Sequence, residues 1–213
     1  MQNNTFDIYS QMNFLNPGML GTKELSEIIL DSEIENLKVA PSNIGLVGIE
    51  KEFYKNTKER ELVLKRKIDP IKKDFDYIII DSPPALGPIT INTLSASTSV
   101  LIPIQCEFFA LEGLAQLLNT IKLVKQTINQ SLQIRGFLPT MYSAQNNLSK
   151  QVFADLAQHF ENKLFKIDDN SYVVIPRNVK LAESPSFGKP IMLYDTNSSG
   201  TKAYTHLARA IAG

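Results

Sequence analysis

Residues 76–84 read DYIIIDSPP, and this stretch carries the strongest prediction about the fold. Three consecutive isoleucines end at a carboxylate, and two prolines then stiffen the chain. A short, continuous and β-branched apolar run is typical of a parallel strand that is covered on both faces. We therefore predict a buried strand over residues 76–81, with Asp81 at its carboxyl end.

Segments with the pattern of strands and helices alternate along the rest of the chain. Helices are predicted over residues 22–32, 89–98, 108–130, 147–162 and 200–213, and further strands over 36–43, 99–105, 132–142 and 172–178. Residues 49–74 are charged and predict a solvated helix pair that Pro70 interrupts. This alternation predicts an α/β fold, doubly wound, with a mostly parallel sheet and helices on both faces.

Composition narrows the class of protein. The 213 residues suit one domain, and 43% of them are hydrophobic, enough for a sizeable core. The 22 basic and 22 acidic residues balance, which argues against a protein that coats nucleic acid over its whole surface. The single cysteine, Cys106, forms no internal disulfide, and no apolar run approaches the ~18 residues of a membrane span. The first twenty residues are polar, and we expect them to be poorly ordered. They lack the features of a signal peptide, so we expect a cytoplasmic protein.

Ligands of doubly wound sheets bind at the carboxyl ends of the strands. That rule makes Asp81, Gln105, Thr140 and Pro176 candidate site residues, because each ends or follows a predicted strand. For Asp81 two interpretations stay open on this evidence. The carboxylate either caps the following turn or helix, or it holds Mg²⁺ beside a bound phosphate.

Several longer motifs occur in order and carry a family resemblance. The stretch FDYIIIDSPPALGPITINTLSAS at 75–97 resembles the Walker B region of the ParA/Soj/MinD group of deviant P-loop ATPases. Further segments similar to the ParA/Soj branch are SVLIPIQCEFFALEGLAQLLNTI at 99–121, IRGFLPTMYSAQNNLSKQV at 134–152, IPRNVKLAESPSFGKPIMLYD at 175–195 and SSGTKAY at 198–204. The resemblance runs from about residue 36 to the C-terminus, so the chain is identified as a member of the ParA/Soj family.

The resemblance implies a function and a set of site residues. ParA/Soj proteins bind ATP and Mg²⁺, dimerise around nucleotide, bind DNA without sequence preference and segregate chromosomes or plasmids with a ParB/Spo0J-type partner. The resemblance also implies that the protein is cytoplasmic and associated with the nucleoid. Asp81 would take the Walker B role and order Mg²⁺ through water, with Pro84 beside the phosphates. Thr140, Met141 and Pro176 would line the adenine, although residues at strand ends are often there only for turn geometry.

The resemblance also implies DNA contacts near the end of the chain. Lysine and arginine neutralise phosphates without reading bases, which suits nonspecific, salt-sensitive binding. Scattered basic residues are otherwise an ordinary solvated face. Glu183 lies among them and weakens a simple basic patch, and Arg177 follows a strand, where it is also suited to the nucleotide site. The candidate DNA-binding residues are Arg177, Lys180, Lys189, Lys202 and Arg209.

The chain departs from the family pattern in one large respect. Family members open with a strand, a KGGVGKT-like phosphate loop and a second strand that ends in an acid. No G-x-x-x-x-G-K-[ST] arrangement occurs here, and the one Gly-Lys pair, at Gly188-Lys189, is followed by Pro190. We therefore expect an N-terminally truncated ParA-like domain over residues 1–213, short by about 40 residues at typical element lengths. Without the phosphate loop this chain should hydrolyse ATP poorly.

Two alternative functions are also compatible with the sequence. A degenerate ParA fragment could act without catalysis, as a module that binds DNA, ParB or ParA. A MinD-like site regulator is the weaker alternative, because ARAIAG at the end of the chain is not a basic amphipathic membrane helix.

His159 and His206 are expected on helix surfaces, and Cys106 lacks a nearby histidine to make it a nucleophile.

Overall fold

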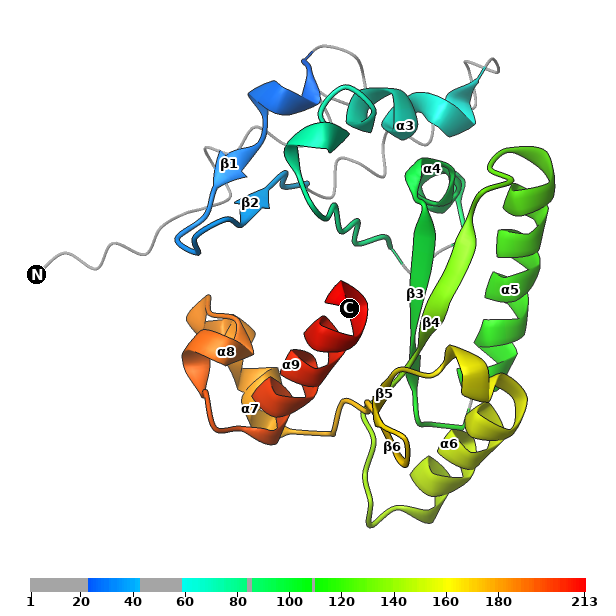
Figure 1. Ribbon diagram of the computed structural model, residues 1–213, viewed down its shortest axis with the longest axis vertical. Coiled ribbons are helices and arrows are strands. Elements are labelled where there is room, and N and C mark those ends of the chain that lie inside the picture. Colours follow the sequence, from blue (N-terminus) through cyan, green and yellow to red (C-terminus); the bar gives the residue numbers. More distant parts are fainter. Residues whose placement is uncertain (1–22, 43–58, 84–85, 109) are drawn as a thin grey trace, which may run out of the picture. The chain divides into compact units, whose positions relative to one another are not determined.

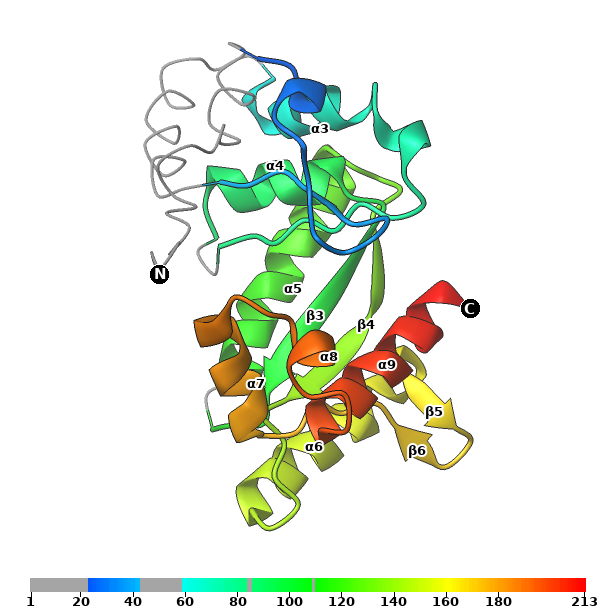
Figure 2. The ribbon, with the colours of Figure 1, turned by 90° about the vertical axis from the view of Figure 1, so that its left-hand side faces the viewer.

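The computed structural model describes residues 23–42, 59–83, 86–108 and 110–213. The chain forms two compact units (Figures 1 and 2). The first comprises residues 1–98 and 123–131, and the second comprises 99–122 and 132–213. The expectation of poor order for residues 1–20, the position of Pro84 and the first part of the predicted helix pair at 49–74 lie outside the described residues.

A parallel strand pair forms the centre of the second unit. Strands β3 (Ser99–Gln105) and β4 (Gln133–Thr140) pair in parallel from Ser99↔Gln133 to Gln105↔Thr140, with one register shift after Val100. Single parallel bridges extend the pairing on the far side of β4, from Phe137 to Leu164 and from Tyr142 to Pro176. Both strands match their predicted ranges closely.

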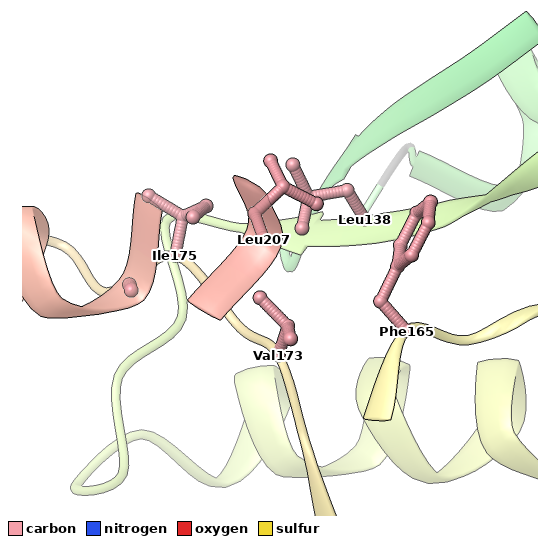
Figure 3. Close-up of a cluster of buried hydrophobic side chains, with 6 residues drawn as sticks. Leu138, Phe165, Val173, Ile175 and Leu207 are labelled. Carbon is pink, nitrogen blue, oxygen red and sulfur yellow. The ribbon is translucent and has the colours of Figure 1, made fainter. Parts of the chain in front are cut away.

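Helices cover both faces of this pair, and the alternation of side chains along β4 explains how. The Phe137 ring lies 4.5 Å from that of Phe160 on α6 (Asn147–Phe160), between ring centroids. The next residue, Leu138, points the other way and packs against Leu207 of α9 (Ser199–Ala212), as Figure 3 shows. The chain therefore has the predicted α/β fold, with a parallel sheet between helices.

Polar side chains define where the helices of the second unit begin. Asn146 Oδ1 accepts a hydrogen bond from the Leu148 amide at the start of α6, and Ser198 Oγ accepts one from the Thr201 amide at the start of α9. The remaining helices and strands of this unit are α5 (Ala110–Thr127, which continues into the first unit), η4 (Glu161–Lys163), the antiparallel hairpin β5 (Lys166–Asp168) and β6 (Ser171–Tyr172), α7 (Val179–Glu183), η5 (Ser184–Phe187) and α8 (Ile191–Tyr194).

The first unit has its own small core. Its elements are η1 (Leu25–Glu27), the antiparallel strands β1 (Leu30–Asp31) and β2 (Lys38–Val39), η2 (Arg60–Leu62), α3 (Val63–Ile68), η3 (Lys72–Asp74) and α4 (Pro88–Ala96). Leu25, Ile28, Leu64 and Ile68 are buried together. The buried Asn92 side chain accepts from the Leu64 amide and donates to the carbonyl oxygens of Arg60 and Pro88, which ties α4 to η2 and α3.

Three predicted elements are wrong or shorter than expected. Residues 76–81 form no strand, and the Ile79 side chain is 92% exposed. No described residue pairs with this segment, and a strand needs a neighbour for its backbone groups. In place of the helix over 22–32, a single η1 turn leads into β1, which pairs with β2 across a turn whose Asn36 is left-handed (φ 62°). In the predicted strand 172–178, only Tyr172 belongs to a strand, β6, while Pro176 makes its single bridge to Tyr142.

Candidate nucleotide site at the carboxyl ends of the strands

The carboxyl ends of β3 and β4 are fastened together. The Cys106 amide, one residue past β3, donates to the Thr140 carbonyl oxygen at 2.9 Å. Gln105 and Thr140 are register partners at the last position of the pair. These two predicted site residues therefore lie side by side at the edge where ligands of such sheets bind.

The segment after β4 is held beside residues 175–177. Hydrogen bonds run from the Ile175 amide to the Pro139 carbonyl at 2.8 Å and from the Tyr142 amide to the Ile175 carbonyl at 3.1 Å. The Arg177 amide then donates to the Tyr142 carbonyl at 2.9 Å. This ladder brings Thr140, Met141 and Pro176 into one loop pair, although Met141 and Pro176 are far apart in sequence.

Met141 has an unusual backbone conformation within that ladder. Its φ is +54°, in the left-handed region that residues other than glycine rarely adopt, and its side chain is 42% exposed. The amide of the next residue is fixed by Ile175, so the surrounding hydrogen bonds hold the strained conformation. Backbone strain of this kind gathers at ligand sites, which supports the predicted role of this loop.

An open pocket of about 720 Å³ lies next to the end of β3. Its polar lining comes from Gln105, Glu107, Asn146, Ser149 and Arg177, and its apolar lining from β3 and α5. The guanidinium of Arg177 forms an ion pair with the carboxylate of Glu107. The sequence reasoning missed Glu107, Asn146 and Ser149; for Glu107, its position two residues past the end of a predicted strand was the available signal.

The Cys106 thiol is not suited to nucleophilic chemistry. Cys106 is 1% exposed, and burial raises the pKa of its thiol to about 11. Its carbonyl oxygen accepts a hydrogen bond from Ser149 Oγ at 3.2 Å, which joins the end of β3 to α6. At neutral pH the thiol keeps its proton, so Cys106 has a structural role here.

Asp81 belongs to the first unit, whereas the residues just described belong to the second. Its carboxylate is exposed, and residues 81–83 have no regular secondary structure. Within the described ranges, no three His, Cys, Asp or Glu side chains gather in a way that would hold a metal ion. The Walker B role of Asp81 and the phosphate role of Pro84 stay predictions.

Two of the five candidate DNA-binding residues are already paired with carboxylates. Arg177 is bound by Glu107, and Lys180 Nζ lies 3.1 Å from Glu183 Oε2. The hydrogen bond to Glu183 raises the pKa of the Lys180 ammonium, and the same contact lowers the pKa of the Glu183 carboxyl. The expectation that Glu183 weakens the basic patch agrees with this pairing.

The other three candidates, Lys189, Lys202 and Arg209, are exposed. Among the residues that the structure describes, none of the three has a salt-bridge partner. Within the same part of the chain, no helix combines the length and apolar character that crossing a bilayer requires.

A parallel sheet flanked by helices, with polar residues gathered at its carboxyl edge, defines an α/β protein of the class that binds ligands at the ends of its strands. Solved structures share this fold. Cobyrinic acid a,c-diamide synthase from Mycobacterium smegmatis, solved with bound ADP and magnesium, is 32% identical and has a TM-score of 0.74, with 93% of this chain and 71% of that one covered. McdA from Cyanothece is 19% identical with a TM-score of 0.80, over 94% and 78% of the two chains, which shows the fold alone.

Sequence relatives identify the family. A family model described as an AAA domain matches residues 1–134. Sporulation initiation inhibitor protein Soj from Bacillus subtilis is 49% identical over 89% of this chain and 72% of its own length. Chromosome partitioning protein ParA from Myxococcus xanthus is 43% identical over 91% of this chain and 66% of its own length. The chain belongs to the ParA/Soj family.

Proposed function

We propose that this chain is a ParA/Soj-type partitioning protein that binds ATP and Mg²⁺ and acts, in its complete form, as a DNA-binding dimer with a ParB/Spo0J-type partner. Its work is the segregation of a chromosome or plasmid, in the cytoplasm and on the nucleoid. The relatives named for partitioning support this proposal. The structural observation that carries it is the convergence of Thr140, Met141 and Pro176 at the carboxyl edge of the parallel strands.

In this proposal the converging loops hold the base, and Asp81 serves the metal. The main chain around Met141 is fixed by hydrogen bonds on both sides, so its exposed side chain is held at this edge, where it would pack against the adenine. Asp81 carries an exposed carboxylate, the hard oxygen donor that Mg²⁺ prefers, and would hold the ion through water. Bound Mg²⁺ would neutralise phosphate charge.

We further propose that this 213-residue chain alone hydrolyses ATP slowly or not at all. Hydrolysis in P-loop proteins depends on backbone amides and a lysine that surround the phosphates. The sequence contains no motif of that kind. The residues described here hold one end of the nucleotide, and the phosphate end needs a loop that this sequence does not supply.

A thermal melt of the purified chain with and without ATP and Mg²⁺ tests nucleotide binding. A ligand that binds only the folded state raises the melting temperature. We expect ATP to raise it, Asp81→Asn to abolish the additional effect of Mg²⁺, and the matched change Asp74→Asn to leave it intact. A parallel phosphate-release assay should show no turnover, with or without a ParB-type partner. An unchanged melt would refute nucleotide binding, and rapid turnover would refute the hydrolysis claim.

One observation favours a second candidate function, a non-enzymatic module that pairs with a complete ParA protein. Ile78 is 41% exposed and Ile79 92% exposed, in a segment whose sequence is typical of a buried strand. An unpaired apolar segment with strand propensity is suited to pairing with another chain. Co-purification of this chain with a full-length ParA, lost in Ile79→Asp, would support the module. Failure to co-purify would exclude it.

A further inference from the structure

The peptide group that joins Cys106 to Glu107, just past the end of β3, is held at both of its ends. Its N–H belongs to Glu107 and donates to the Gln105 carbonyl oxygen at 2.8 Å. Its carbonyl oxygen belongs to Cys106 and accepts a hydrogen bond from Ser149 Oγ at 3.2 Å. Such a peptide group cannot rotate without losing a hydrogen bond, so the two contacts fix the direction in which the chain leaves β3.

Ser149 supplies its hydroxyl from the first turn of α6 and is 2% exposed. A serine within a helix commonly donates to a carbonyl of its own helix. The Ser149 hydroxyl instead bonds to Cys106, 43 positions earlier in the sequence. Because both residues are buried, water does not readily replace this hydrogen bond. The bond is therefore a tertiary link between α6 and the turn after β3.

The turn after β3 determines where the Glu107 carboxylate lies. This carboxylate accepts a hydrogen bond from the Arg177 guanidinium, and the Arg177 amide donates to the Tyr142 carbonyl oxygen at 2.9 Å. Arg177 is thus joined to the turn by its side chain and to the loop after β4 by its backbone. The Glu107 and Arg177 side chains are both more than half exposed, so their ion pair is weak by itself and depends on the backbone that carries it.

We propose that Ser149 is a positioning residue for the candidate nucleotide site. Through the Cys106 carbonyl, Ser149 fixes the turn that carries Glu107. Glu107 then holds Arg177 and, with it, Pro176 beside the carboxyl ends of the strands. A binding site needs such supporting hydrogen bonds to keep its geometry. This inference rests on the nucleotide binding of the proposed function and adds to it a residue that acts through its neighbours.

Calorimetric titration of ATP with Mg²⁺ into the purified chain tests the proposal, at a temperature where circular dichroism shows every variant to be folded. The variant is Ser149→Ala, which removes the donor to the Cys106 carbonyl. The matched control is Ser95→Ala in α4, because Ser95 is also 2% exposed and donates to the Ile91 carbonyl of its own helix at 2.7 Å. Both variants should lower the melting temperature. Only Ser149→Ala should weaken ATP binding, by about fivefold or more.

A double variant shows whether Ser149 acts through Glu107. Glu107→Ala should also weaken ATP binding, because Arg177 then loses its partner. If the two residues belong to one series of contacts, the double variant should bind ATP no more weakly than the weaker single variant. Losses that multiply would overturn the route through Glu107. Glu107 is more than half exposed, so Glu107→Ala should fold even if Ser149→Ala does not, and unchanged ATP binding in it would also overturn this route.

Amide hydrogen exchange of the chain without nucleotide gives a second measurement, which does not depend on ATP. Ser149→Ala should speed exchange at the Glu107 and Arg177 amides, and Ser95→Ala should not. Native ATP affinity in Ser149→Ala, or an equal loss of affinity in Ser95→Ala, overturns the proposal. If the unaltered chain binds no ATP, the proposed function itself fails. Faster exchange in Ser149→Ala would then still support the fixed turn, and unchanged exchange would overturn it.

Discussion

The carboxylate of Glu107 accepts a hydrogen bond from the guanidinium of Arg177, so the residue that follows Pro176 is bound to a residue that follows β3. The two residues are 70 positions apart in sequence, and both line the pocket at the carboxyl end of β3. The positive charge of Arg177, the basic residue of the IPRN segment, is therefore neutralised by a carboxylate of the same chain.

The first prediction concerns the charge of this pair. Because Glu107 already neutralises Arg177, Arg177→Gln removes no free cation and should lower the affinity for duplex DNA by no more than a few-fold, through the carboxylate that it leaves uncompensated. Glu107→Gln exposes an uncompensated cation and should raise that affinity a few-fold at low salt, an increase that the double variant abolishes. Both side chains are more than half exposed, so each variant should change the free energy of unfolding by less than about 1 kcal/mol. A large loss of DNA affinity in Arg177→Gln alone would contradict this view.

The second prediction concerns a close approach inside β4. A Cβ at Gly136 would lie 2.7 Å from the Lys163 carbonyl oxygen and 2.8 Å from the Phe165 ring, so Gly136→Ala forces backbone and ring to move. Overpacking of this kind should lower the free energy of unfolding by about 1–3 kcal/mol. The control is Gly113→Ala in α5, where a Cβ meets nothing within 4 Å. It should stabilise the helix by about 0.5–1 kcal/mol. Urea denaturation measures both, and shifts of the same sign would contradict the argument.

The sequence predicted best those elements whose partners are also in this chain. β3 and β4 satisfy each other's backbone groups, and α6 and α9 bury their apolar faces on the two sides of β4. The strand over 76–81 has an equally clear local pattern but no partner among the described residues, and propensity alone does not make a strand. The helix over 22–32 gave way to a hairpin because a left-handed Asn36 closes a turn that periodicity does not reveal.

The same distinction applies to the candidate site residues: a local pattern predicted some of them, and the others depend on tertiary structure. The rule that ligands bind at strand ends selected Gln105 and Thr140 correctly as ends of β3 and β4, because the pattern supplied those two strands. The same rule selected Pro176, which reaches this edge only through its bridge to Tyr142, and Asp81, which follows no strand. It did not find Glu107, whose partner is 70 residues away. Long-range contacts of charged side chains depend on tertiary structure, so a local sequence pattern does not predict them.

The third prediction concerns pH and the Cys106 thiol. The pKa of this thiol is about 11 in the folded chain and about 9 when unfolded. Below pH 9 both states keep the proton and stability is unaffected. Between pH 9 and 11 only the unfolded chain loses it, so the free energy of unfolding falls as pH rises, by at most about 1.4 kcal/mol per pH unit.

Cys106→Ala removes this contribution, which separates it from tyrosine and lysine titration in the same interval. The difference in unfolding free energy between the native chain and Cys106→Ala, followed by urea denaturation from pH 8 to 11, should shrink as the pH rises. The thiol should also resist alkylation by iodoacetamide at pH 8 until urea unfolds the chain. A constant difference together with rapid alkylation of the folded protein would show that the thiol is not protected by burial.

The last prediction uses the strained backbone at Met141. Met141 has a φ of +54° and a partly exposed side chain. Its replacement by glycine should therefore remove little packing and should relieve the backbone strain. Met141→Gly should therefore keep the free energy of unfolding or raise it by up to about 1 kcal/mol, whereas the β-branched Met141→Val should lower it by about 1–2 kcal/mol. If the Met141 side chain packs against the adenine, the glycine variant should nevertheless lose most of the rise in melting temperature that ATP causes. Stability and nucleotide binding would then change in opposite directions at one residue, and that separation is the signature of strain kept for a ligand. A glycine variant as unstable as the valine variant would mean that the Met141 side chain contributes packing to the fold, and that the strain is not kept for a ligand.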